Sequence, residues 1–193
     1  MAPSKLADRS KQRRSVAFLR GINVGGHRVT KDELIAVFAD IGHTRVDTFL
    51  ASGNVLFQPT TTPQTAEAVA DIEATIAAAL EQALGYAVPT TLRTPAQMVV
   101  LATSAPFSDE QLAASDGKPQ VMLLFAEPTS EAEKQVLALS TADDQLAFGP
   151  RALHWLPSGG MADSTLDLKA IGDVLGQQTI RTVNTVRRLL PKL

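Results

Sequence analysis

The chain of 193 residues contains no cysteine, and this absence removes several kinds of chemistry at once. Disulfide bonds, thiolate metal sites and a cysteine nucleophile are all excluded. No apolar run approaches the roughly 18–20 residues that a membrane-spanning helix needs. The basic N-terminus is not followed by the apolar stretch of a signal peptide. We therefore expect a cytoplasmic protein with no membrane partner.

Familiar catalytic and metal-binding patterns are missing as well. The three histidines, His27, His43 and His154, form no H-x-H or H-x-x-x-H pair, so no metal site is expected. The G-x-S-x-G pattern of a hydrolase nucleophile does not occur. His43 directly follows a helix-ending glycine, where a surface or capping position is expected. The sequence therefore identifies no catalytic residue, no metal and no cofactor.

Positive charge is unevenly distributed, although the net charge is only −2. Residues 1–31 carry eight Lys or Arg against one acid, and residues 174–193 carry four with no acid, so the middle of the chain is acidic. The two basic ends could form one positive face if the fold brings them together. Residues 1–14 lack hydrophobic periodicity, and the alternative is that they form a disordered, solvated basic tail.

Hydrophobic periodicity in residues 15–94 predicts an α+β domain of the ferredoxin-like kind, the alpha-beta plait. An apolar run before a group of glycines indicates a buried strand, and Thr30 with Glu33 forms a capping box that starts a helix. Two β-branched and aromatic runs flank residues 51–54, which is a hairpin pattern. A long helix ended by Gly85 and a last strand complete the order β-α-β-β-α-β. The expected strands cover 16–19, 46–50, 55–57 and 87–93, and the second helix covers about 64–84.

Residues 95–193 are expected to form a second α+β domain, again plait-like. The order there is β-α-β-β-α, with the last strand short or replaced. A terminal helix over 181–190 would place Arg181 at a helix start. The other expected elements are strands at 121–125, 145–148 and 152–156 and helices at 96–103, 128–139 and 164–175.

The segment from Arg20 to Gly26 (RGINVGG) directly follows the first strand and precedes the capped helix. Backbone amides in such a loop can point at an anion, and the helix dipole favours negative charge there. The spacing fits neither the G-x-G-x-x-G dinucleotide pattern nor the G-K-[ST] ending of a nucleoside-triphosphate loop. The alternative is a structural turn whose glycines permit positive φ or close packing.

Two further segments have both a structural and a ligand-binding interpretation. Ser52-Gly53-Asn54 is a hairpin turn by default, although Asn54 could also present its amide to a ligand. The stretch from Thr179 to Val186 is explained by an amphipathic packing helix. The clustering of Arg181 with Asn184 and Thr185 would also suit an anion site.

These segments together resemble domain-of-unknown-function family 1697, which consists of small bacterial proteins. Its L-R-G-I-N-V-G-G motif matches over Leu19 to Gly26, and its T-x-x-x-S-G-N-V-x-F hairpin matches over Thr48 to Phe57. The resemblance implies two ferredoxin-like units and no established activity. A terminal T-x-R-N-W-x-T-V motif matches at Thr179, Arg181, Thr185 and Val186 and departs at Thr182 and Val183.

Three hypotheses about function follow. The first is a binding module for an anionic ligand, namely a nucleotide, a phosphorylated metabolite or nucleic acid; no K/R-G-F-x-F run supports the nucleic-acid version. The second is an enzyme of unknown reaction that uses the same polar site. The third is a structural or interaction protein that forms a homodimer. Across these hypotheses the chain is expected to be a monomer or a homodimer. The candidate ligand-binding residues are Arg20, Asn23, Gly25, Gly26, Ser52, Asn54 and Arg181.

Overall fold

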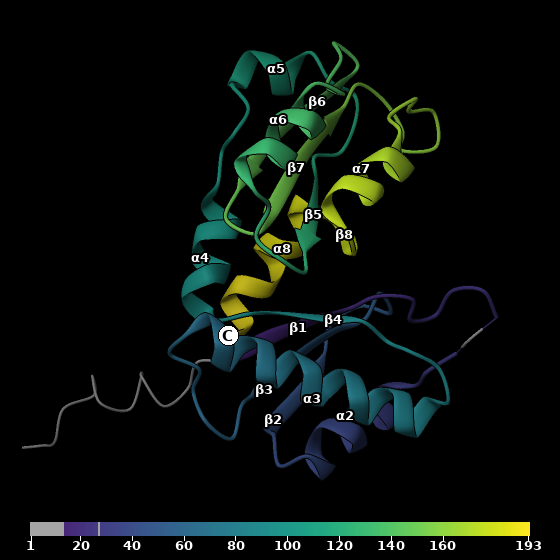
Figure 1. Ribbon diagram of the computed structural model, residues 1–193, viewed down its shortest axis with the longest axis vertical. Helices are drawn as coiled ribbons and strands as arrows, with labels where there is room; N and C mark the ends of the chain where they lie inside the picture. The colour runs from purple at the N-terminus through teal and green to yellow at the C-terminus, as the bar shows by residue number, and fades with distance from the viewer. Residues whose placement is uncertain (1–13, 27) are drawn as a thin grey trace, which may run out of the picture. The chain divides into compact units, whose positions relative to one another are not determined.

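The computed structural model describes residues 14–26 and 28–193, so the basic tail expected over 1–14 lies, apart from Arg14, outside the described residues. The chain divides into two compact units, of which the first comprises Met1–Met98 with Leu189–Leu193 and the second Val99–Arg188. Each unit contains one four-stranded antiparallel sheet and its own helices (Figure 1). The predicted α+β class is confirmed.

The first unit has the element order β-α-β-β-α-β, and its strands lie in the order β2-β3-β1-β4. Its two helices, α2 and α3, pack on the same face of the sheet (Figure 1). The elements are β1 (Ser15–Leu19), α2 (Lys31–Asp40), β2 (Thr44–Thr48), β3 (Asn54–Gln58), α3 (Ala66–Leu84) and β4 (Thr90–Arg93), after which α4 (Pro95–Thr103) leads into the second unit.

Strand β1 is central in its sheet, because it pairs with β3 on one edge and with β4 on the other. Ala17 and Leu19 point toward the helices and join the core there, whereas Val16 and Phe18 lie on the opposite face. Every residue of β1 is buried, so both faces of this strand are covered. An apolar run without alternation is the pattern expected of such a strand.

Local signals in the sequence set the start of α2 and the end of α3. The Oγ1 of Thr30 accepts a hydrogen bond from the N–H of Glu33 (3.2 Å), and a Glu33 carboxylate oxygen accepts one from the N–H of Thr30 (2.7 Å). The predicted capping box is therefore confirmed. Gly85 ends α3 with a φ of +76°, which is the left-handed cap that its position predicted.

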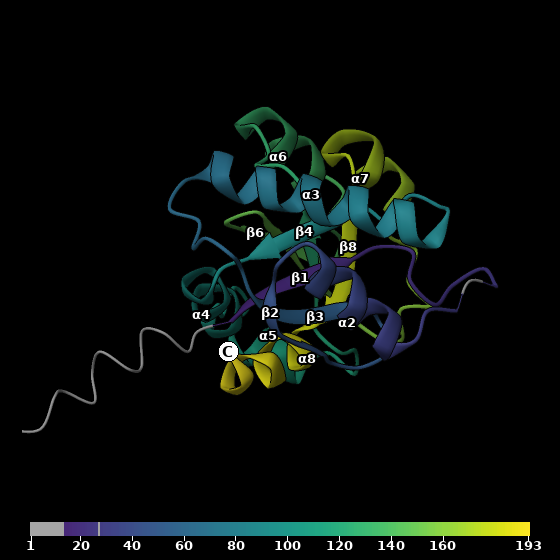
Figure 2. The same ribbon diagram turned by 90° about the horizontal axis from the view of Figure 1, so that it is seen from below.

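The second unit repeats this order, with strands arranged β6-β7-β5-β8 and with α6 and α7 side by side (Figure 2). Its core contains Trp155, whose indole N–H donates a hydrogen bond to the buried carboxylate of Asp144 (2.7 Å). The elements are α5 (Asp109–Ala113), β5 (Gln120–Leu124), α6 (Ser130–Leu137), β6 (Asp144–Gly149), β7 (Ala152–Pro157), α7 (Leu168–Leu175), β8 (Gln178–Thr182) and α8 (Val183–Leu189), and a 3₁₀ turn (Leu190–Lys192) follows in the first unit.

The end of the chain corrects one prediction. The helix expected over 181–190 begins only at Val183, and Arg181 lies on the strand β8, which pairs with β5 from Gln178 to Thr182. The apolar spacing of α8 does not by itself show where the helix begins, and Arg181 and Thr182 belong to the preceding strand. Thr182 marks the true boundary, because its Oγ1 accepts a hydrogen bond from the N–H of Thr185 (3.1 Å).

Both units place an arginine at the same position of the last strand. Arg93 on β4 and Arg181 on β8 each follow a threonine by two residues. In each case Nη1 donates hydrogen bonds of 2.8 Å to that threonine's Oγ1 and 2.8 Å to the carbonyl oxygen of the residue between them. The two sheets therefore share a detail of side-chain bonding as well as a strand order.

None of the helices in residues 14–26 and 28–193 is long and apolar enough to cross a membrane.

His43 occupies a buried position instead of the expected surface one, with 7% of its surface exposed. Its ring stacks on that of Phe57 with 4.6 Å between centroids, and Nδ1 lies 3.3 Å from the Oγ1 of Thr60. Burial lowers the pKa of this imidazole, since the charged form loses hydration. His154 in the second unit has its pKa lowered for the same reason.

These lowered histidine pKa values predict a stability that falls in mild acid. The unfolded chain takes up protons at its histidines around pH 6.5, before the folded protein does, so the free energy of unfolding should decrease as the pH drops below about 6.5. Urea unfolding at pH 7.5 and 5.5 measures this decrease, and His43→Phe should make it smaller. The lowered carboxylate pKa values of Glu33 and Asp47 act only below about 4.5 and do not interfere. If the stability of His43→Phe depended on pH as that of the wild type does, His43 would not be a source of this pH dependence.

Candidate functional site

The glycine loop, described over residues 20–26 and 28–30 between β1 and α2, is bonded to the β2–β3 turn by Asn23. The Nδ2 of Asn23 donates a hydrogen bond to the carbonyl oxygen of Ala51 (2.8 Å), and its Oδ1 accepts one from the N–H of Val29 (2.9 Å). Its φ of +57° is one that asparagine tolerates better than most residues. Asn23 therefore supports the loop from within, with both ends of its amide engaged by the chain.

The turn itself packs closely against the start of the loop at Gly53. The N–H of Leu19 donates a hydrogen bond to the Gly53 carbonyl oxygen (2.8 Å). A Cβ at Gly53 would lie 3.0 Å from the Cβ of Leu19 and 3.3 Å from that of Ile22, and the residue has a φ of +74°. Both the contact and the backbone conformation demand glycine here.

Ser52 and Asn54 serve to close this turn. Asn54 is fully buried, and its Nδ2 donates hydrogen bonds to the carbonyl oxygen of Phe49 (2.7 Å) and to the Oγ of Ser52 (2.9 Å). The structure thus brings the two motifs together, since the glycine loop and the hairpin turn are bound to each other through Asn23 and Gly53.

Gly25 and Gly26 lie on the exposed part of the glycine loop. They have φ values of +61° and +90°, and their N–H groups donate hydrogen bonds to no described residue. Beside them is a surface hollow of about 570 Å³. Among the described residues, the exposed guanidinium groups of Arg20 and Arg28 also have no partner. The hollow is lined by Asn23, Gly26, Arg28, Val29, Thr30 and Ala51.

Two acidic residues stand at the start of α2. Hydrogen bonds from the backbone N–H of Thr30 and from its hydroxyl lower the pKa of Glu33, so this carboxylate is ionised at neutral pH. Asp32 is its neighbour in the first helical turn. These carboxylates already complement the helix dipole, so an anion at the loop would depend mainly on the glycine amides and the arginines.

Arg181 lies in the second unit, whereas the other six candidate residues lie in the first. It is 8% exposed, and its guanidinium is hydrogen-bonded within β8 to Thr179 and Ile180. Burial lowers the pKa of Arg181 to about 10, and the group stays protonated at neutral pH.

The described lining of the hollow offers little for acid–base chemistry. Of its described lining residues, only Arg28 has a titratable side chain, and an arginine is a poor general base. Within residues 14–26 and 28–193, no three His, Asp or Glu side chains are grouped to hold a metal ion. Arg28 was not among the residues expected from the sequence, although a basic residue two positions before the helix cap Thr30 was the available signal.

Gly53 and Gly85 provide a matched test of the contact between loop and turn, because their φ values are +74° and +76°. Replacing either by alanine should cost about 1 kcal/mol for the left-handed backbone. Gly53→Ala should cost about 1–3 kcal/mol more, since only its Cβ meets packed atoms. Urea unfolding of both variants measures the difference. Equal decreases in the free energy of unfolding would show that the contact at Gly53 does not contribute to stability.

Comparisons with known proteins concern the fold and the family of the chain. The chain is similar in structure to the conserved bacterial protein SP0830 from Streptococcus pneumoniae, with a TM-score of 0.68 and 16% identity over 93% of this chain and 98% of that one. Such low identity shows a shared fold alone. A comparison with curated proteins finds no match. The sequence profile of a family described as protein of unknown function (DUF1697) matches residues 13–154, well over half of the chain. The chain therefore belongs to the DUF1697 family.

Proposed function

We propose that this protein is a binding module for a small anionic ligand, which the glycine loop of the first unit holds. One observation carries the proposal. The exposed N–H groups of Gly25 and Gly26 pair with no described residue and lie in a loop that begins at Arg20 and reaches Arg28 beside a surface hollow.

The donors offered by the loop define the ligand. Backbone N–H groups and guanidinium groups donate hydrogen bonds and accept none, so they suit the oxygens of a phosphate or a carboxylate. Because Asn23 is bonded on both sides, little ordering is needed when a ligand arrives. The third cation of this segment, Lys31, is already paired with Asp47 (2.7 Å). We infer that a phosphorylated metabolite is the natural class of ligand, with Arg28 as its charged partner.

Binding without turnover fits the lining of the hollow. A general base or a nucleophile is needed for most hydrolytic and transfer reactions. The hydroxyl of Thr30 in the described lining is bonded to the carboxylate of Glu33 (2.7 Å), and no other described lining residue offers either group. The enzyme hypothesis consequently has less support than the binding hypothesis.

We also propose that both units are ferredoxin-like domains. The order β-α-β-β-α-β, the strand arrangement with the first strand between the third and the fourth, and the two helices on one face support this classification. The repeated arginine on β4 and β8 supports treating them as the same fold twice.

Titrating the full chain with inorganic phosphate and recording its amide NMR spectra at each step tests whether the glycine loop binds an anion. We expect saturable shifts of the Gly25 and Gly26 amides at low ionic strength, and no such shifts with sodium chloride at equal ionic strength. Arg28→Gln should weaken phosphate binding roughly tenfold, because it removes a charged hydrogen bond. Glu33→Gln should strengthen it about two- to threefold, because glutamine keeps the capping box and removes a negative charge.

Lys134→Gln is the matched control, since it removes one exposed positive charge from α6 of the second unit. Its phosphate affinity should equal that of the wild type. Amide shifts that spread evenly over the chain, or equal losses in Arg28→Gln and Lys134→Gln, would rule out a site at the glycine loop.

A further inference from the structure

A separate cavity of about 160 Å³ lies in the second unit, and every residue that lines it belongs to that unit. Most of its lining is apolar, with Phe107, Leu112 and Val183 among the contributors. Four polar residues also line it: Ser104, His154, Asn184 and Arg187. The hydroxyl of Ser104 already donates a hydrogen bond to the carbonyl oxygen of Val100 (2.9 Å). A mainly apolar cavity with a few convergent polar groups is the usual form of a small-molecule site.

His154 is the unusual member of this cavity. Only 2% of its surface is exposed, and neither Nδ1 nor Nε2 has a hydrogen-bond partner among the described residues. Buried polar groups are nearly always paired, so this imidazole in the lining of a cavity can pair with a ligand or with water that enters the cavity. Burial also lowers its pKa, and the neutral ring offers one donor and one acceptor.

The fold does not require a histidine at this position. In the first unit, Leu56 pairs with the central Val16 in the same way that His154 pairs with Val121 in the second. Leu56 is fully buried in its sheet without any polar group. The equivalent sheet position is therefore filled by an ordinary apolar residue in one unit and by an unpaired imidazole in the other.

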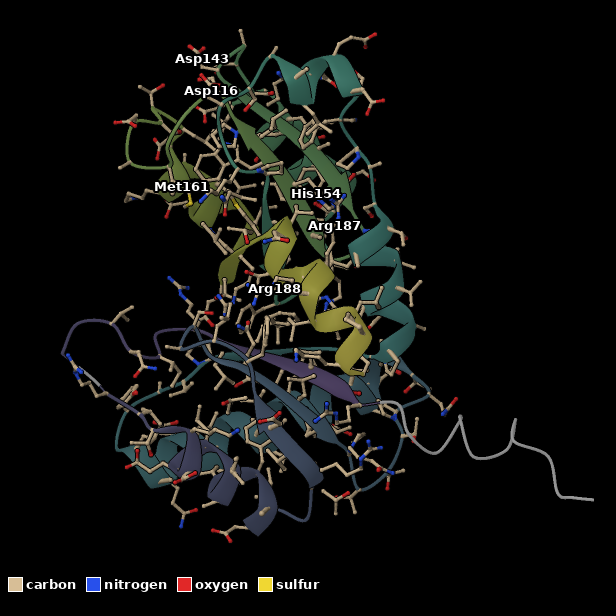
Figure 3. The ribbon with its side chains drawn as sticks, turned by 180° about the vertical axis from the view of Figure 1, so that it is seen from behind. Asp116, Asp143, His154, Met161, Arg187 and Arg188 are labelled. Atoms are coloured by element: carbon tan, nitrogen blue, oxygen red, sulfur yellow. The ribbon has the colours of Figure 1, made fainter. Side chains whose placement is uncertain are left out.

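Arg187 adds a charge to the same cavity. It lies three residues after Asn184 on α8, so the two side chains share one helix face. Its Nε donates a hydrogen bond to the carbonyl oxygen of Ala102 (3.3 Å), which orients the guanidinium and leaves its Nη groups without a described partner. Figure 3 shows His154 on β7 and Arg187 on α8 beside each other, in agreement with their shared cavity.

We propose that this cavity binds a small aromatic acid of a single ring. The ring packs against Phe107 and Leu112, and the acid group accepts hydrogen bonds from Arg187, Asn184 and the N–H of His154. The size agrees, because an engineered apolar cavity of about 150 Å³ accommodates one benzene molecule. This site is independent of the glycine loop, since its residues belong to the other unit.

Benzoate is the probe, and benzyl alcohol is its uncharged counterpart. Titration calorimetry on the full chain should show benzoate binding and roughly tenfold weaker binding of benzyl alcohol, which lacks the negative charge. Arg187→Gln should weaken benzoate binding roughly tenfold, whereas Arg188→Gln, the adjacent arginine labelled in Figure 3, should bind as the wild type does. The side-chain NMR signal of His154 should move on addition of benzoate.

His154→Leu copies the residue that the first unit has at this position, and it should weaken benzoate binding several-fold while the protein stays folded. Three results would overturn the proposal. They are equal losses in Arg187→Gln and Arg188→Gln, equal affinities for benzoate and benzyl alcohol, or a His154 signal that does not respond. If His154→Leu does not fold, the pair of arginine variants decides. The phosphate titration at Gly25 and Gly26 is a different experiment from the benzoate titration, so a negative result at one site leaves the result at the other unaffected.

Discussion

The contact of Gly53 with Leu19 and Ile22 determines where the glycine loop of the first unit lies. Without a Cβ at Gly53, the β2–β3 turn approaches the end of β1 closely enough for the N–H of Leu19 to reach the Gly53 carbonyl oxygen. Asn23 then bonds to Ala51 in the same turn. Because these contacts are short and specific, the loop leaves β1 in one direction and presents its glycines to solvent in a set conformation.

This packing assigns different roles to residues of one motif. Asn23 and Asn54 look like ligand-binding amides in the sequence, yet their side-chain nitrogens bond to backbone carbonyl oxygens of the same turn. The glycines that look like simple turn residues have N–H groups that pair with no described residue. A binding loop needs both kinds of residue, since donors that are free to rotate lose entropy when they bind.

What the sequence could predict depended on how local the interaction is. The capping box of Thr30 and the cap at Gly85 join residues three or four apart, and both were predicted correctly. The strand β8 was missed because its conformation depends on pairing with β5, more than fifty residues earlier in the chain. Burial of His43 against Phe57 and the cavity position of His154 depend on distant contacts in the same way. For the candidate site, the sequence pointed to the glycine loop and did not show which of its groups are bonded within the chain.

A fold that occurs twice in one chain separates what the fold requires from what it permits. The arginine on the last strand and its bond to the preceding threonine occur in both units, so they are explained by the architecture. Leu56 and His154 differ at equivalent positions, and no described residue pairs with the buried nitrogens of the histidine, which by itself lowers stability. Where the two units differ and the difference lowers the stability of one of them, a bound ligand explains the residue better than packing does.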